Sequence, residues 1–141
     1  MDERGNLYGT TSDGGDFKAG TVFKLDTSGK ETVLHSFNGK DGRSPEAGVF
    51  RDAKGNLYGA TFLGGVNRDG GTVFKVDTTG KATVLHNFEG KKGGVKPSAG
   101  LVMDEARNLY GTTTLGGEYS TSCNAYSYPS RYCGTIFKIT P

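Results

Sequence analysis

The residues best suited to bind a ligand are concentrated in one segment, residues 118–133. This segment holds four tyrosines together with Glu, Asn and Arg side chains. Tyrosine presents a flat apolar ring with a polar tip, which suits stacking on a sugar ring or anchoring a protein partner. The alternative interpretation is a loop that only caps the adjacent strands or fills a contact between subunits. The predicted contact residues are Glu118, Tyr119, Asn124, Tyr126, Tyr128, Arg131 and Tyr132.

The same segment contains the only two cysteines, Cys123 and Cys133. We predict that they form a disulfide, which would stabilise the fold by roughly 2–3 kcal/mol and preorganise the loop for binding. Such a crosslink is typical of secreted or periplasmic proteins. A zinc site is not favoured, because two cysteines without a nearby histidine make a poor ligand set.

Carboxylates and histidines also recur at equivalent positions along the chain. Asp2, Asp52 and Asp104 each precede the same short motif. Paired carboxylates at a set separation could hydrolyse glycosides, but we favour turn formation, since aspartate readily bonds nearby backbone amides. His35 and His86 are equivalent to one another. We interpret them as packing or hydrogen-bonding residues, with a symmetric metal site across subunits as the alternative.

No familiar catalytic motif is present. The chain lacks G-x-S-x-G, H-E-x-x-H and a P-loop, and we expect neither a cofactor nor a bound metal. Asp26 and Asp77 each precede a Ser/Thr-Gly turn, so we interpret them as turn-forming residues, like Asp2, Asp52 and Asp104. Near-identical repeats favour binding or a scaffold over catalysis, because catalysis normally needs one asymmetric constellation.

The elements that position these residues are repeated. The phrase Gly-Asn-Leu-Tyr-Gly-Thr-Thr and its close variants occupy residues 5–11, 55–61 and 107–113, and Gly-Thr-Val-Phe-Lys-Leu and its variants occupy residues 20–25, 71–76 and 134–139. A period near 50 residues indicates an array of one supersecondary unit. The loop between the two phrases has 8 residues in the first unit, 9 in the second and 20 in the third, so the third carries the ligand-binding candidate.

Each unit is predicted to form four short strands. In the middle unit these are residues 45–52, 57–61, 72–76 and 83–88, which are β-branched and aromatic runs bounded by Gly, Asp and Asn. Phe74 and Val76 should point to one face of the sheet and Val73 to the other. Gly55 fits the left-handed position of the turn before the second strand. Arg107 replaces that glycine in the third unit, so we expect a turn of another type there.

Four antiparallel strands per unit is the size of a β-propeller blade. We therefore predict an all-β fold of propeller-type blades, about three per chain and two of them incomplete. Residues 1–141 would form a single repeat domain with units 1–44, 45–96 and 97–141 and an insert loop at 118–133. Closed propellers need four to eight blades, so we expect a homo-oligomer that completes a ring.

These motifs, together with Leu-His-Ser-Phe and the following Pro-x-Ala-Gly, resemble the GloVer tandem repeat, over nearly the whole chain except residues 118–133. The resemblance implies a secreted bacterial propeller-like array. It implies no particular activity.

Composition narrows the remaining function classes. The 141 residues include 24 Gly and no Trp, and the net charge is +2 with both signs dispersed. No basic block suggests nucleic acid, and no apolar run is long enough for a membrane span. A signal peptide is not present in this sequence, which opens Met-Asp-Glu-Arg. We expect an extracellular or periplasmic location.

The function predicted from the sequence is a binding module, most plausibly for carbohydrate or a cell-surface partner. Its contact surface would combine the tyrosine-rich loop with the shorter loops at residues 12–19 and 62–70. Two alternatives remain open at this point. One is a polysaccharide-active hydrolase or lyase, and the other is a structural or adhesion array without a small ligand.

Overall fold

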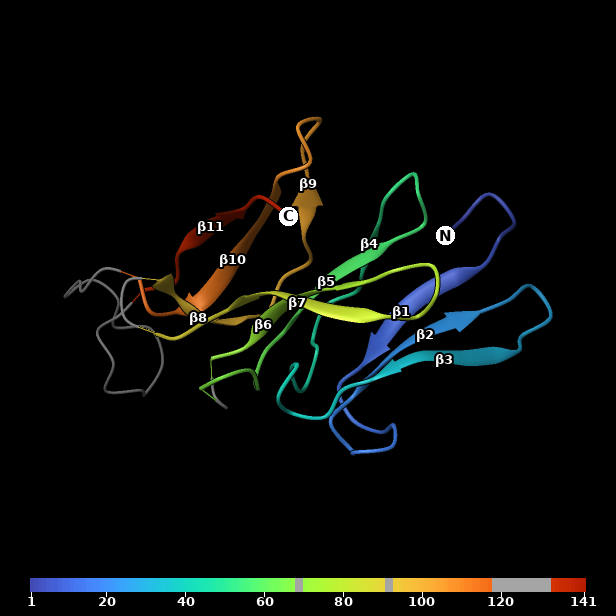
Figure 1. The fold of residues 1–141 in the computed structure, drawn as a ribbon, viewed down its shortest axis with the longest axis horizontal. Helices are drawn as coiled ribbons and strands as arrows, with labels where there is room; N and C mark the ends of the chain where they lie inside the picture. The colour runs from blue at the N-terminus through green and yellow to red at the C-terminus, as the bar shows by residue number, and fades with distance from the viewer. Residues whose placement is uncertain (68–69, 91–92, 118–132) are drawn as a thin grey trace.

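The computed structural model describes residues 1–67, 70–90, 93–117 and 133–141, and these residues form antiparallel β-sheets without an α-helix (Figure 1). The strands are β1 (Leu7–Thr11), β2 (Thr21–Leu25), β3 (Glu31–Ser36), β4 (Phe50–Arg51), β5 (Leu57–Thr61), β6 (Thr72–Val76), β7 (Ala82–Asn87), β8 (Val95–Pro97), β9 (Val102–Met103), β10 (Leu109–Leu115) and β11 (Ile136–Ile139). The all-β prediction is confirmed.

The strands form three sheets that follow one another along the chain. The first has the order β1-β2-β3, the second β4-β5-β6-β7, and the third β11-β10-β8 with β9 also paired to β10. Within the described residues the sheets do not close a ring (Figure 1). The division of the chain at 44/45 and 96/97 stays a prediction.

The two repeated phrases pair with each other in register. Gly59 of β5 lies opposite Phe74 of β6, and Gly9 and Gly111 face their own phenylalanines in the same way. A Cβ atom on Gly59 would lie 2.5 Å from Cζ of Phe74. The glycine of the first phrase is therefore needed because the phenylalanine ring of the second phrase lies over it.

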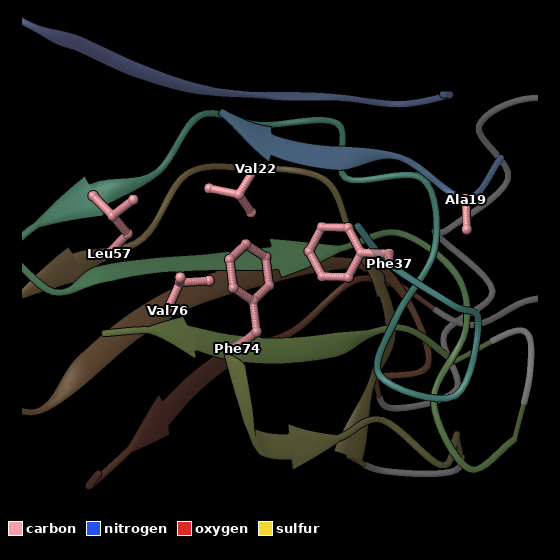
Figure 2. Packing of buried hydrophobic residues seen from close by; sticks show 6 residues of the cluster. All are labelled: Ala19, Val22, Phe37, Leu57, Phe74 and Val76. Carbon is pink, nitrogen blue, oxygen red and sulfur yellow. The ribbon is translucent and has the colours of Figure 1, made fainter. Parts of the chain in front are cut away.

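The hydrophobic core lies between successive sheets. One cluster joins Val22 and Phe37 of the first unit to Leu57, Phe74 and Val76 of the second (Figure 2). The rings of Phe37 and Phe74 meet edge to face with centroids 5.0 Å apart, a favourable arrangement of aromatic pairs.

A second cluster forms on the other face of the middle sheet. It joins Val73 and Phe88 to Leu101 and Leu109 of the third unit, and Phe88 meets Phe137 with centroids 5.0 Å apart. Val73 thus points away from Phe74 and Val76, as predicted. The middle sheet is buried on both faces, which explains why β6 is apolar on both sides.

The predicted first strand, residues 45–52, is wrong in extent, since only Phe50–Arg51 pairs as β4. The preceding segment runs between sheets instead. Ser44 N–H donates to the carbonyl of Ala19 at 2.9 Å, and the carbonyl of Ala47 accepts from Thr10 Oγ1 at 2.9 Å. A segment bonded to a neighbouring unit cannot also continue the ladder of its own sheet.

The turn at Arg107 is of the same type as its glycine counterparts, contrary to expectation. Arg107 has a φ of +68°, and its N–H donates to the carbonyl of Asp104 at 2.9 Å, as Gly55 N–H does to Asp52. The left-handed conformation positions the side chain toward the second unit. There Nη2 lies 3.0 Å from Oδ2 of Asp52. The contact between units offsets the local backbone cost.

Candidate ligand-binding groove at the loop edge

The longer loops lie along one edge of the stacked sheets. They include residues 12–19, 38–44 and 62–67, whereas the tight turns that contain the repeated aspartates lie at the opposite edge (Figure 1). In an antiparallel sheet, successive connections between strands lie at opposite ends of the sheet. Because the units repeat, the longer loops lie at one end and the tight aspartate turns at the other. We call the first of these the loop edge.

A groove of about 600 Å³ opens at this edge where the first sheet meets the second. Its lining consists of Asn38, Gly39, Lys40, Arg43, Gly64, Gly65 and Val66. Two loops from different units thus form the two walls. Grooves between packed units are common ligand sites, because the walls bring side chains together from separate elements.

Glycines allow the two walls to approach closely. Gly64 has a φ of +86°, and a Cβ atom there would lie 2.6 Å from the backbone nitrogen of Arg43. Arg43 and Leu63 exchange backbone hydrogen bonds of 2.7 and 3.0 Å. Gly65 N–H donates to the carbonyl of Gly39 at 2.9 Å. The groove is therefore built on a paired backbone rather than on two independent loops.

Asp41 holds the first wall in shape. Its Oδ1 accepts from the N–H of Asn38 at 2.9 Å, and its Oδ2 lies 2.9 Å from Nε2 of His35. Asn38 Oδ1 in turn accepts from the N–H of Lys40 at 2.9 Å. The carboxylate of Asp41 is thus used within its own loop, and the loop can present Lys40 at low entropic cost.

The charge of the groove comes from Lys40 and Arg43, which are both exposed. Across the described part of the chain, neither side chain forms an ion pair. A guanidinium binds carboxylates in a bidentate way, and an ammonium adds a mobile point charge. The arrangement suits a ligand that carries negative charge and hydroxyl groups.

The two histidines differ in their surroundings. His35 bonds to Asp41 and packs edge to face on Phe37, whereas exposed His86 packs on Phe88 and has no hydrogen bond within the described residues. The hydrogen-bonding interpretation is thus confirmed for His35. No set of three metal-ligating side chains occurs among the described residues.

The repeated aspartates are turn residues. Asp52 Oδ1 accepts the N–H groups of Lys54 and Asn56, and its Oδ2 accepts from Asn56 Nδ2 at 2.9 Å and from Tyr58 Oη at 3.3 Å. Burial opposes ionisation of Asp52, but these hydrogen bonds outweigh it and lower its pKa. Asp2 and Asp104 likewise accept from the backbone N–H and Nδ2 of the following asparagine and from the tyrosine hydroxyl of their own units.

The predicted tyrosine-rich contact residues lie outside the described residues. This holds for Glu118, Tyr119, Asn124, Tyr126, Tyr128, Arg131 and Tyr132, and also for Cys123. Only Cys133 at the end of the segment and the preceding Gly117 are described. Gly117 N–H donates to the carbonyl of Cys133 at 2.6 Å. The disulfide and the contact role of these side chains stay predictions.

Sequence reasoning included residues 62–70 in the contact surface but missed the opposite wall. Asn38, Lys40 and Arg43 lie in a connection between units, and this connection was not considered as a site. The available signal was the glycine spacing: Gly39 and Gly42 in one loop and the Gly64-Gly65 pair in the other. Glycines in two loops are typical of close backbone approach.

Comparison with known families matches residues 1–141 to the Gloeobacter/Verrucomicrobia repeat. The chain belongs to this repeat family. The Gloeobacter/Verrucomicrobia repeat confirms the resemblance drawn from the motifs. No match was found among curated proteins. No described segment forms a helix with the length and hydropathy of a membrane span.

Proposed function

We propose that this repeat protein is an extracellular or periplasmic propeller-type module that binds acidic carbohydrate at its loop edge. The observation that carries the proposal is the groove between the first two sheets, where Lys40 and Arg43 are exposed and form no ion pair with any carboxylate among the described residues. Uronic acids and sulfated sugars combine anionic groups with hydroxyls, which these cations and the adjacent Asn38 can bind.

The tyrosine-rich segment would extend this surface. Stacking of Tyr126 or Tyr128 on a sugar ring would add apolar contact to the charge recognition of the groove. The predicted Cys123–Cys133 disulfide would hold the segment in place and is typical of an oxidising compartment. Repeated blades packed side by side would align several such edges along one chain of sugars.

The alternative of a polysaccharide-cleaving enzyme is less well supported. A general acid at neutral pH needs a raised pKa, whereas Asp2, Asp52 and Asp104 have lowered pKa values and bond to their own turns. Asp26 and Asp77 have lowered pKa values for the same kind of reason. These carboxylates therefore serve the fold, and a cleavage mechanism would require other groups.

A binding assay on immobilised polysaccharides tests the proposal. Polygalacturonate should retain the protein, neutral glucans should not, and rising salt should weaken retention because it screens exposed charges. The double variant Lys40→Ala/Arg43→Ala should bind at least about tenfold more weakly, since hydrogen bonds to charged groups contribute about 1.5–3 kcal/mol.

A charge-matched control separates the groove from the net charge. Lys30 and Lys81 lie in exposed turns at the opposite edge, so Lys30→Ala/Lys81→Ala removes two positive charges elsewhere. This control should bind as the wild type does. Equal losses in both double variants, or no retention of the wild type on any acidic glycan, would overturn the proposal.

A further inference from the structure

On two faces of the stacked sheets, residues are exposed whose counterparts in the other repeat units are buried. Val22 and Val73 occupy the same place in the first two units and have 0% exposure. Their counterpart in the third unit, Ile136, is 78% exposed, and Val102 on the same face is 65% exposed. We call this face of β9, β10 and β11 the leading face.

The opposite face of the first sheet shows the complementary pattern. Leu57 and Leu109 have 2% and 0% exposure, whereas their counterpart Leu7 is 48% exposed. Val33 of β3 lies on the same face as Leu7, by the pairing of β1, β2 and β3, and is 49% exposed. We call this the trailing face.

The interfaces inside the molecule show what covers each face. Val22 packs in one cluster with Leu57 (Figure 2), and Val73 packs in the other cluster with Leu109. Each interface therefore joins the valine position of one unit to the leucine position of the next. Ile136 and Leu7 are the members of this pair that remain exposed.

We propose that the protein self-associates head to tail, with the leading face of one copy on the trailing face of a second copy. The partner is a second copy of this chain because its trailing face presents Leu7 in the position that covers valine inside the molecule. Exposed apolar faces of this kind mark interaction sites, and a leading-to-trailing contact is heterologous.

For residues 1–141 by themselves, the three described sheets of each copy favour a closed dimer. Two copies bring six sheets together, which lies within the range of four to eight blades that close a propeller, whereas three copies would bring nine. In the dimer each copy uses both faces, so no leading or trailing face stays exposed. This assembly does not involve the loop-edge groove and goes beyond the proposed function.

Light scattering with size-exclusion chromatography tests the assembly. The wild type should have about twice the 14.9 kDa mass of one chain. Leu7→Glu and Ile136→Lys should each be monomeric, because a buried unpaired charge opposes packing of the two faces. Val66→Lys, at a 71% exposed position in the loop-edge groove, should remain dimeric.

Mixing the two variants tests the head-to-tail arrangement. A mixed dimer has one unaltered interface and one with a Glu–Lys pair, so an equimolar mixture should recover the dimer mass. A symmetric leading-to-leading dimer predicts instead that Leu7→Glu alone stays dimeric. That result, or a monomeric wild type, would overturn the proposal.

The mass measurements on the variants test the assembly, and the binding assay tests the proposed function, so the two proposals can fail independently. Both substituted residues are about half exposed or more, so unchanged far-ultraviolet circular dichroism is expected and would show that the monomers are folded. A wild-type protein that is monomeric but binds polygalacturonate would refute the assembly alone. A dimer that binds no acidic glycan would refute the proposed function alone.

Discussion

Arg107 combines a local backbone cost with a contact between units. Its φ of +68° is a conformation in which a side chain costs on the order of 1 kcal/mol. Its guanidinium reaches Asp52, 55 residues earlier in the chain, at 3.0 Å. The side chain of Arg107 is 47% exposed, so the ion pair contributes about 1 kcal/mol or less. The two effects are of similar size and opposite sign.

Two substitutions separate these effects. Arg107→Ala loses the ion pair and keeps the backbone cost, so its free energy of unfolding should fall by about 1 kcal/mol. Arg107→Gly loses the pair but relieves the backbone, so it should stay close to the wild type. Urea unfolding curves measure the difference. Equal stability of the Ala and Gly variants would contradict the account.

This residue also shows a limit of sequence reasoning. Gly5 and Gly55 predict a left-handed position, and the repeat aligns Arg107 with them. The pattern within one unit indicates that Arg107 is unfavourable there. The compensating contact lies in another unit, and no local pattern contains it. The same holds for Lys40 and Arg43, which form a site only when loops of two units are paired.

At the scale of the strands, the glycine of one phrase and the phenylalanine of the other form a single packing unit. β5 and β6 have the predicted bounds, because their alternation and flanking turns determine them locally. β4 is far shorter than predicted, because Ala47 bonds to Thr10 of the first unit instead of continuing the strand. Local sequence patterns predicted the bounds of the inner strands β5 and β6, whereas contacts between sheets determined the length of β4.

Substitution of Gly59 tests the pairing of the two phrases. A Cβ atom at this position meets Phe74 Cζ at 2.5 Å in the buried core. Gly59→Ala should lower the free energy of unfolding by about 1–3 kcal/mol through overpacking. Gly48→Ala is the control, because a Cβ atom there meets nothing within 4 Å.

The double variant Gly59→Ala/Phe74→Leu completes the test. A smaller side chain opposite the new methyl group should remove part of the clash, so the two effects should not be additive. Chemical unfolding of the four proteins measures the coupling energy. Strict additivity would show that the glycine is needed for another reason.

At the scale of the whole molecule, stability arises between neighbouring sheets. Each core cluster joins two consecutive units, as in repeat proteins whose stability is a sum of unit and nearest-neighbour terms.

The turns at the opposite edge add a second repeated feature. In each unit an aspartate with a lowered pKa closes the turn before the second strand, and Asp26 and Asp77 close the following hairpins.

The lowered pKa values of these aspartates predict how the stability of the fold changes at low pH. Hydrogen bonds lower the pKa of Asp26, from the Ser28 side chain first, and of Asp77, from the Thr79 side chain first. A carboxylate with a lower pKa in the folded state stabilises the fold at pH values above its unfolded pKa, which is about 4. This stabilisation is lost as pH falls through the folded pKa. The contribution of these aspartates to the urea midpoint should therefore fall below about pH 4.

Substitutions assign this acid response to the turns. Asp26→Asn/Asp77→Asn should be less stable than the wild type at pH 7, and the difference should shrink as pH falls through the lowered folded-state pKa of these carboxylates, because the wild-type groups then become neutral as well. Asp13→Asn is the control, because the Asp13 carboxylate makes no hydrogen bond within the described chain. A difference between the double variant and the wild type that persists unchanged at pH 2 would mean that geometry, rather than charge, accounts for the contribution of these turns.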